Sequence, residues 1–144
     1  MDIYARLRED HGKQRGLGAG LLETSGDSAE RERLFRLLKN EVQAHAAAEE
    51  QTFYAELIAM SDGQERARHS IAEHKEAADL LEELSNIDMS SSAWITRYRQ
   101  LHERLVHHLD EEEDEVFVRA RELISGGRAK ALAAEFDARK RDEV

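Results

Sequence analysis

The sequence predicts an all-α protein: an up-down-up-down antiparallel four-helix bundle made of two repeated helical hairpins, with a short C-terminal helix. The chain contains no proline, so nothing removes a backbone donor from a long helix. No segment alternates polar and apolar residues for long enough to indicate a strand. Residues 1–63 and 64–126 share matching side chains at an offset of 63 positions. Short connections between helices favour antiparallel neighbours, which gives the bundle.

The first predicted helix covers residues 2–24, where Ile3, Leu7 and Leu21 follow a helical spacing. Glycine inside a helix costs about 1 kcal/mol relative to alanine. Four glycines lie inside this one: Gly12, Gly16, Gly18 and Gly20. We therefore expect this helix to be the weakest of the set, or to pack unusually close to a neighbour.

The second predicted helix begins at a cap formed by Asp27 or Ser28 and runs to about Met60. Gly63 is expected to close this hairpin half in a left-handed conformation, which glycine adopts without steric cost. A third helix is predicted over roughly 64–85.

The fourth predicted helix begins at a serine cap, Ser90 or Ser91, and extends to about Ile124. A pair of glycines is then expected to break the chain before a polar helix near 128–141. Each half of the chain thus contains one shorter predicted helix followed by one longer predicted helix.

The length and composition of the chain limit its organisation and its partners. At 144 residues it can bury one core, and we assign residues 1–126 to the bundle and 127–144 to a C-terminal helical appendage. The net charge of −10 would repel a polyanion, so nucleic acid is not expected as a partner. Absence of cysteine excludes disulfides and thiolate-bound metals. With no long apolar run and no signal peptide, we expect a cytoplasmic protein that avoids membranes.

The strongest indication of function is a set of histidines and glutamates that recurs between the two halves. At the offset of 63 positions, His11, His45 and Glu49 match His74, His108 and Glu112. On each long helix the histidine and the glutamate lie four residues apart on an otherwise apolar face. A glutamate that points into a core is costly unless something compensates its charge, and bound cations are the simplest compensation. The sequence therefore predicts that these six residues bind metal.

The donor types indicate which ions and ligands such a site would take. Imidazole suits iron, zinc, copper and nickel, and a carboxylate can bridge two of them. Calcium and magnesium prefer an oxygen shell and fit poorly. Two histidines per ion and two shared glutamates leave each ion short of six ligands, unlike a closed structural site. Dioxygen, peroxide or nitric oxide could bind at the remaining positions.

These residues resemble the haemerythrin and HHE cation-binding domain family in order, spacing and placement on helices. The resemblance covers about residues 1–125. Its local motifs are Glu-Asp-His at 9–11, His-Ala-Ala-Ala-Glu-Glu at 45–50, Ala-Glu-His-Lys at 72–75 and His-Leu-Asp-Glu-Glu-Glu at 108–113.

The resemblance implies a non-haem centre of two iron ions with an oxo or hydroxo bridge. One iron would be held by His11 and His45 and the other by His74 and His108. Glu49 and Glu112 would bridge the two ions. Zinc and manganese remain alternatives to iron.

One position departs from the pattern of the oxygen-carrying members of this family. Those proteins have a fifth histidine four residues after the histidine of the third helix, whereas this chain has Ala78, and its repeat partner is Arg15. The site thus resembles more symmetric four-histidine variants rather than a reversible oxygen carrier.

We expect a di-iron protein that binds dioxygen or a related small molecule, in oxygen or redox sensing or in iron handling. The alternative is a di-iron enzyme that decomposes peroxide, as a catalase does, or reacts with nitric oxide. A third possibility is a helical interaction module whose polar core binds no metal. Binding without catalysis is the preferred expectation.

Several nearby residues are not assigned as ligands. The positions that match His69, His102 and His107 in the first half hold no histidine, so these three are interpreted as solvated or as neighbours of the ligands. Glu50 and Glu113 do recur, but are interpreted as helix-surface charges, and Tyr54 and Phe117 as core packing.

Overall fold

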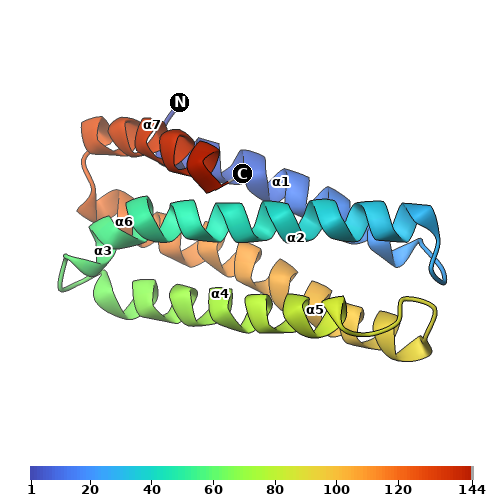
Figure 1. Ribbon diagram of the computed structural model, residues 1–144. Helices are drawn as coiled ribbons and strands as arrows, with labels where there is room; N and C mark the ends of the chain where they lie inside the picture. The colour runs from blue at the N-terminus through green and yellow to red at the C-terminus, as the bar shows by residue number, and fades with distance from the viewer. Residues whose placement is uncertain (144) are drawn as a thin grey trace.

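A computed structural model describes residues 1–143, and over this range the protein is all-helical, with 85% helix and no strand. Residues 1–143 form five helical segments in succession, and Figure 1 shows their arrangement. They are α1 (Ile3–Leu22); α2 (Ala29–Glu49) with the π-helical turn η1 (Glu50–Tyr54) and α3 (Ala55–Ile58); α4 (Gln64–Ser85); α5 (Ser92–Glu111) with the π-helical turn η2 (Glu112–Val116) and α6 (Phe117–Leu123); and α7 (Gly126–Glu143). The predicted all-α class is confirmed.

Side-chain caps start four of these helices, including α7, where Ser125 accepts a hydrogen bond from the backbone N–H of Arg128. Asp2 accepts a hydrogen bond from the backbone N–H of Ala5 at the start of α1. Ser28 caps α2 and Ser91 caps α5 in the same way, each with an extended backbone. A cap of this kind satisfies one of the first N–H groups of a helix, which have no partner inside it.

The helices lie lengthwise beside one another (Figure 1). α1 packs against α2, and α4 packs against α5. The C-terminal helix α7 lies along α1 and α2, and its Leu132 and Phe136 are fully buried. α7 thus completes the core on the side of the first hairpin, while residue 144 of the predicted appendage lies outside the described residues.

Two apolar clusters fill the interior. One contains Tyr54, Phe117 and Phe136, and the other contains Leu38 and Trp94. Each of the helices α1, α2, α4 and α5, with the turn that continues it, contributes residues to both clusters. On each helix the predicted ligands lie between the part that enters one cluster and the part that enters the other. The polar site is therefore sandwiched between two apolar layers.

Gly63 departs from the prediction, whereas Gly18 fits the close packing expected of the first helix. Gly63 has a right-handed φ of −107°, so the left-handed conformation expected there is wrong. A Cβ at Gly63 would lie 2.6 Å from the carbonyl oxygen of Leu57, so close approach requires the glycine. Within residues 1–143 only Gly26, between α1 and α2, has a positive φ, 61°. Gly18 is the closely packed glycine of α1, because a Cβ there would lie 3.0 Å from the His102 ring.

The position of the break between the fourth predicted helix and the C-terminal helix also differs from the prediction. Gly126 and Gly127 belong to α7 itself, and the break in the helix comes at Ile124, whose backbone is extended. Among residues 1–143, no helix combines the length and the apolar character needed to cross a bilayer.

Candidate metal centre

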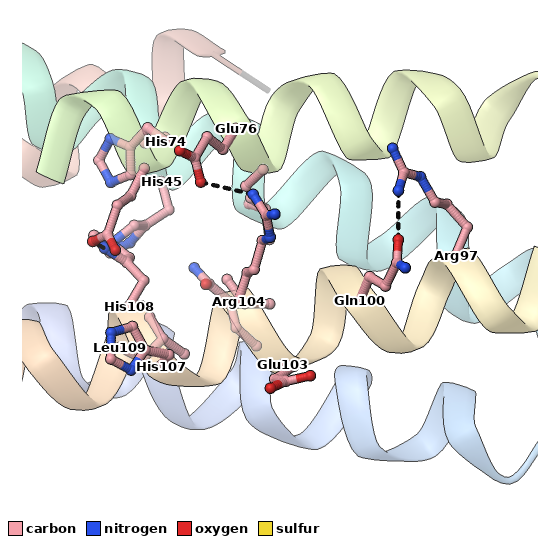
Figure 2. A pocket seen from close by; sticks show the side chains of 16 residues that line it. His45, His74, Glu76, Arg97, Gln100, Glu103, Arg104, His107, His108 and Leu109 are labelled. Atoms are coloured by element: carbon pink, nitrogen blue, oxygen red, sulfur yellow. Dashed lines mark hydrogen bonds and ion pairs between the residues drawn. The ribbon is translucent and has the colours of Figure 1, made fainter.

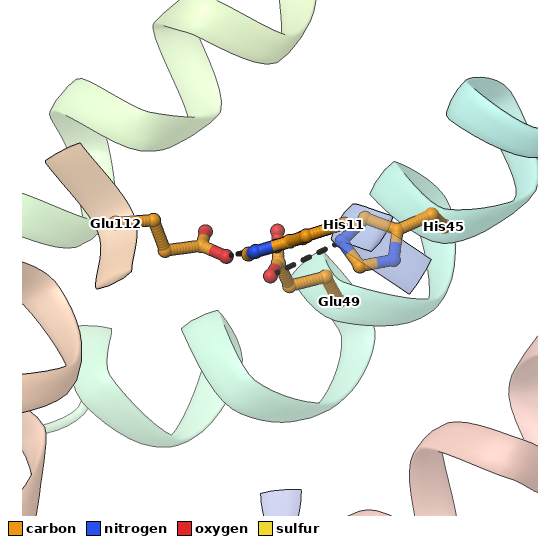
Figure 3. Close-up of side chains that lie close together, drawn as sticks. All are labelled: His11, His45, Glu49 and Glu112. Carbon is orange, nitrogen blue, oxygen red and sulfur yellow. Dashed lines mark ion pairs between the residues drawn. The ribbon is translucent and has the colours of Figure 1, made fainter. Parts of the chain in front are cut away.

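All six predicted site residues turn inward and meet between the two apolar layers. They come from α1, α2, α4, α5 and the first position of η2. None of their side chains is more than 9% exposed: His11, His45, Glu49, His74, His108 and Glu112. Figure 3 shows four of them, with both carboxylates directed toward the imidazoles.

The donor atoms form two groups that share the same two carboxylates. In each group the donor atoms lie within 4.8 Å of one another. One group contains His11 and His45, the other contains His74 and His108, and Glu49 and Glu112 belong to both. The division between the groups is the one that the family resemblance implies.

Each shared carboxylate directs one oxygen to each half of the site. Glu49 Oε2 lies 3.4 Å from His45 Nε2, and its Oε1 lies 3.1 Å from His74 Nε2. Glu112 Oε1 lies 2.9 Å from His11 Nε2, and its Oε2 lies 3.8 Å from His108 Nε2. A carboxylate that spans two positions in this way is arranged to bridge two cations.

These donor atoms face each other, but none of them forms a hydrogen bond with another. Six buried side-chain polar atoms among residues 1–143 have no hydrogen-bond partner, and four of them are His11 Nε2, both oxygens of Glu49 and Glu112 Oε1. Such groups are costly to bury unless something satisfies them. Two ligand atoms at right angles on one ion, each about 2.1 Å from it, lie about 3.0 Å apart. The observed separations near 3 Å therefore fit metal ligands.

A second layer of carboxylates contacts Nδ1, the ring nitrogen that faces away from the centre, of all four site histidines. His45 Nδ1 donates to Asp10 at 2.8 Å, and His108 Nδ1 donates to Glu73 at 2.7 Å. The remaining two pairs are His11 with Glu113 at 2.6 Å and His74 with Glu50 at 2.8 Å. This contact fixes the ring and leaves Nε2 free to bind an ion.

The outer carboxylates obey the same repeat as the ligands. Asp10 and Glu73 are 63 positions apart, as are Glu50 and Glu113. Glu50 and Glu113, interpreted as helix-surface charges, are partly exposed and belong to neither group of candidate ligands, but each also reaches across to a histidine of the other half. Sequence reasoning missed Asp10 and Glu73 as well, although the repeat contained the signal.

A π-helical turn begins at the end of each buried His-x-x-x-Glu pair. η1 begins at Glu50, directly after Glu49, and η2 begins at Glu112. Such turns are rare and frequently occur at functional sites. They place Glu50 and Glu113 inside the widened turns, at the residues that contact the histidines.

Tyr54 adds one contact to the site. Its ring is fully buried in the apolar core, as predicted, and its hydroxyl donates to Oε2 of Glu112. Burial, together with the charge of Glu112, raises the pKa of the Tyr54 phenol well above its usual value. The tyrosine therefore stays protonated and acts as a hydrogen-bond donor to the carboxylate.

The charges of the site are mutually dependent. Burial alone would lower the pKa of His45, but Glu49 and Asp10 raise it to about 10. Burial likewise acts against His74, yet Glu49 and Glu50 raise its pKa to about 9. Burial would raise the pKa of Glu49, but His45 and His74 hold it well below its usual value. Cations, as protons or as metal, compensate the buried acids.

A cavity of about 700 Å³ reaches the site between α2, α4 and α5. Three of the four histidines line it: His45, His74 and His108 (Figure 2). Farther along lie Arg104, which donates to Glu76 at 2.9 Å, and Arg97. The cavity is wide enough for water and small solutes to approach the imidazoles.

The residues that sequence reasoning left out lie outside the buried groups. The side chains of His69 and His107 are 56% and 70% exposed, and the His102 ring lies against Tyr98 near Gly18. Arg15, the repeat partner of Ala78, forms ion pairs with Asp110 and Glu113.

The fold and this geometry agree with comparisons to known proteins. The structure resembles a crystal structure of a hemerythrin HHE cation-binding domain-containing protein from Mycobacterium kansasii, with a TM-score of 0.88 and 26% identity over 99% of this chain and 87% of that chain. The sequence is 29% identical over 140 residues to a protein from Nostoc sp. described as a DNA nickase. That match covers 97% of this chain but only 39% of the Nostoc protein. The model of the hemerythrin HHE cation-binding domain matches residues 2–120, and the chain belongs to this metal-binding family.

Proposed function

We propose that this protein is a haemerythrin-like non-haem di-iron protein that binds dioxygen or a related small molecule, within an up-down-up-down four-helix bundle. The observation that carries the proposal is the sharing of Glu49 and Glu112 by two groups of donors. One iron would lie with His11 and His45, and the other with His74 and His108. Iron in these positions would supply redox chemistry toward dioxygen, peroxide or nitric oxide.

The chain's own residues prepare such a centre in three ways. The outer carboxylates orient every imidazole so that Nε2 faces the interior. The carboxylates of Glu49 and Glu112 offer two negative charges in a buried place, which favours cations strongly. The cavity beside His45, His74 and His108 gives a small molecule a route to the centre.

Iron is preferred among the ions that the donors accept. Four imidazoles and two carboxylates suit first-row transition metals, and each ion keeps open positions with this ligand set. The absence of the fifth histidine at Ala78 leaves one more position free than in an oxygen carrier. Sensing of oxygen or redox state, or iron handling, fits a centre with this access.

Metal analysis and an optical spectrum of the purified protein test this proposal together. We expect about two irons per chain and the ferric charge-transfer bands of an oxo-bridged pair. Glu49→Ala and Glu112→Ala should each lose most of the iron, because both ions depend on each carboxylate. A wild-type protein that takes up neither iron nor another transition metal would contradict the proposal.

A second candidate function is decomposition of peroxide or reaction with nitric oxide. The polar lining of the cavity favours it, because Glu73, Glu76 and His107 could carry protons to and from a reacting molecule. Iron-loaded protein should then evolve oxygen from peroxide, and His108→Ala should not. Iron-loaded protein that leaves both peroxide and nitric oxide unchanged would exclude this candidate.

DNA cleavage, the activity in the description of the Nostoc relative, is not part of the proposal. The match covers 39% of that protein, and the net charge of −10 on this chain repels a polyanion.

A further inference from the structure

A second pair of His-x-x-x-Glu motifs lies on the outer side of the helices that supply the buried centre. On α4, His69 precedes Glu73 by four residues, and on α5, His107 precedes Glu111 by four residues. This is the spacing of the two buried pairs, and it places both side chains of a pair on one helix face. None of these four residues belongs to the six predicted ligands.

The outer residues meet across the α4–α5 interface. His69 Nε2 lies 3.1 Å from Glu111 Oε1 on the neighbouring helix and 3.5 Å from Glu73 Oε2 on its own. Donor atoms of these three residues lie within 4.8 Å of one another, the same separation that the two buried groups satisfy. His107 Nε2 lies 3.0 Å from the second oxygen of Glu111. Glu73 lines the cavity, and so does His107 (Figure 2).

The corresponding place in the first half of the repeat already contains cations. The repeat partner of Glu73 is Asp10, and the partner of His69 is Arg6. Arg6 Nη1 and Lys140 Nζ each lie 2.8 Å from an oxygen of Asp10. In the second half no lysine or arginine among residues 1–143 forms an ion pair with Glu73 or Glu111, whose basic neighbours are all imidazoles.

The two halves also differ in what covers this face. The repeat partners of His107 and Glu111 are Ala44 and Ala48, which are buried where α7 packs on α2. No helix of residues 1–143 occupies the equivalent place on α5, where His107 is 70% exposed. Two small residues under a helix are therefore replaced by an imidazole and a carboxylate that solvent can reach.

We propose that His69, Glu73 and Glu111 bind a divalent transition-metal ion at the surface, with His107 holding the second oxygen of Glu111. One imidazole and two carboxylates from two helices suit iron(II), zinc or cobalt(II) better than calcium or magnesium. The ion takes the place that Arg6 and Lys140 fill in the other half.

The outer ion and the buried centre would share Glu73. Its Oε1 accepts the hydrogen bond from His108 Nδ1 at 2.7 Å, while its Oε2 faces His69, so both contacts can exist together. A cation on Oε2 withdraws electron density from the carboxylate and weakens its pull on the His108 proton. Occupancy of the outer site therefore alters the donor strength of one histidine of the buried centre.

Titration of the full-length, iron-loaded protein with cobalt(II), followed by calorimetry and visible absorption, tests the proposal. Wild type should bind one cobalt ion more tightly, by at least tenfold in Kd, than His69→Ala or Glu111→Gln. The matched controls are His102→Ala and Glu76→Gln, which remove a histidine and a glutamate outside the cluster and should keep wild-type binding. Cobalt should also shift the absorption of the buried iron in wild type and not in His69→Ala.

The variants separate this site from the buried one. The ion pairs of His69 and Glu111 involve none of the six proposed ligands, so the iron content of His69→Ala and Glu111→Gln should equal that of wild type. Equal cobalt stoichiometry and Kd in wild type and both variants would overturn the proposal. Cobalt uptake that releases iron to the same extent in wild type and variants would overturn it too, since the binding would then belong to the buried centre.

Discussion

Asp10 Oδ2 accepts a hydrogen bond from His45 Nδ1 at 2.8 Å, and the repeat reproduces this pair as Glu73 and His108 at 2.7 Å. Asp10 is almost fully buried, with Arg6 and Lys140 as further partners. His45, Arg6 and Lys140 hold the pKa of Asp10 far below its usual value despite its burial, so the aspartate is charged and orients the ring.

Asp10→Asn is therefore expected to weaken metal binding at the His45 side. Loss of a carboxylate partner of a metal-binding histidine typically costs 10–100-fold in affinity, and we expect about that loss here. Competition with a chromophoric chelator measures it. Glu9→Gln, at the exposed neighbouring position, is the control and should retain wild-type affinity. Equal affinities for Asp10→Asn and Glu9→Gln would show that the orientation of His45 does not depend on Asp10.

The metal-free protein should lose stability as the pH rises above neutrality. The pKa values of His45 and His74 are about 10 and about 9 in the folded state, above the value near 6.5 expected in the unfolded chain. A group that binds its proton more tightly when folded stabilises the fold fully below the unfolded pKa. This contribution disappears as the pH rises from about 6.5 through the folded values. Urea unfolding of metal-free protein at pH 6, 7.5 and 9 should show the decrease.

Metal should reverse this pH dependence, because it binds neutral imidazoles. Loading at pH 7 should then release protons, which a weakly buffered indicator solution detects, and the stability of the loaded protein should not fall between pH 6.5 and 9. His102→Ala is the control, since His102 lies outside the site and its pKa is lowered by burial. A metal-free protein equally stable at pH 6 and 9 would contradict the charge state proposed for His45 and His74.

Lys140 joins the C-terminal helix to the site, and its replacement should destabilise the protein. Its Nζ lies 2.8 Å from Asp10 and 2.7 Å from Glu41, whose side chains are 3% and 7% exposed. Removing one partner from a buried ion pair leaves the other charge uncompensated, and we expect Lys140→Met to cost about 3 kcal/mol in the free energy of unfolding. Urea unfolding provides the measurement.

Lys130→Met is the matched control, because Lys130 is an exposed lysine of the same helix. A surface change of this kind usually alters stability by less than about 0.5 kcal/mol. If the two variants were equally stable, α7 would be held by its apolar residues alone, and Asp10 would need only Arg6 as its cationic partner.

The sequence predicted the helices well because their ends carry local signals. The range 64–85 matches α4, and the serine caps of α2 and α5 were both among the residues expected. Ser28 and Ser91 cap N–H groups within their own first turns, so a short stretch of sequence contains the information.

The six candidate ligands could also be found from sequence, because the repeat preserves side-chain chemistry at a fixed offset. The repeat also marks the outer carboxylates, but their histidine partners could not be assigned, since Glu50 reaches His74 on another helix and Glu113 reaches His11. Those contacts depend on the distance between helices and on the π-helical turns, and neither leaves a local pattern.

The packing of α7 against the bundle could not be predicted from the local sequence either. Its composition is polar, and only a few side chains, including Leu132 and Phe136, bury its inner face. Whether such a helix docks depends on its partners: Arg6 pairs with Asp137, and Lys140 pairs with Asp10. Those partners lie more than 100 positions away in the chain, so their contacts appear only in the folded structure.

Two glycines, one inside a helix and one in a turn, should respond oppositely to alanine. Gly16 is an exposed position inside α1, and a Cβ added there would meet nothing within 4 Å, so Gly16→Ala should raise the free energy of unfolding by about 1 kcal/mol. At Gly63 the same Cβ would lie 2.6 Å from the backbone oxygen of Leu57. Gly63→Ala should therefore force the turn between α3 and α4 to move, at a cost of about 1–3 kcal/mol. Thermal and urea unfolding of both variants check the signs, and a neutral Gly63→Ala would mean that this turn adjusts without strain.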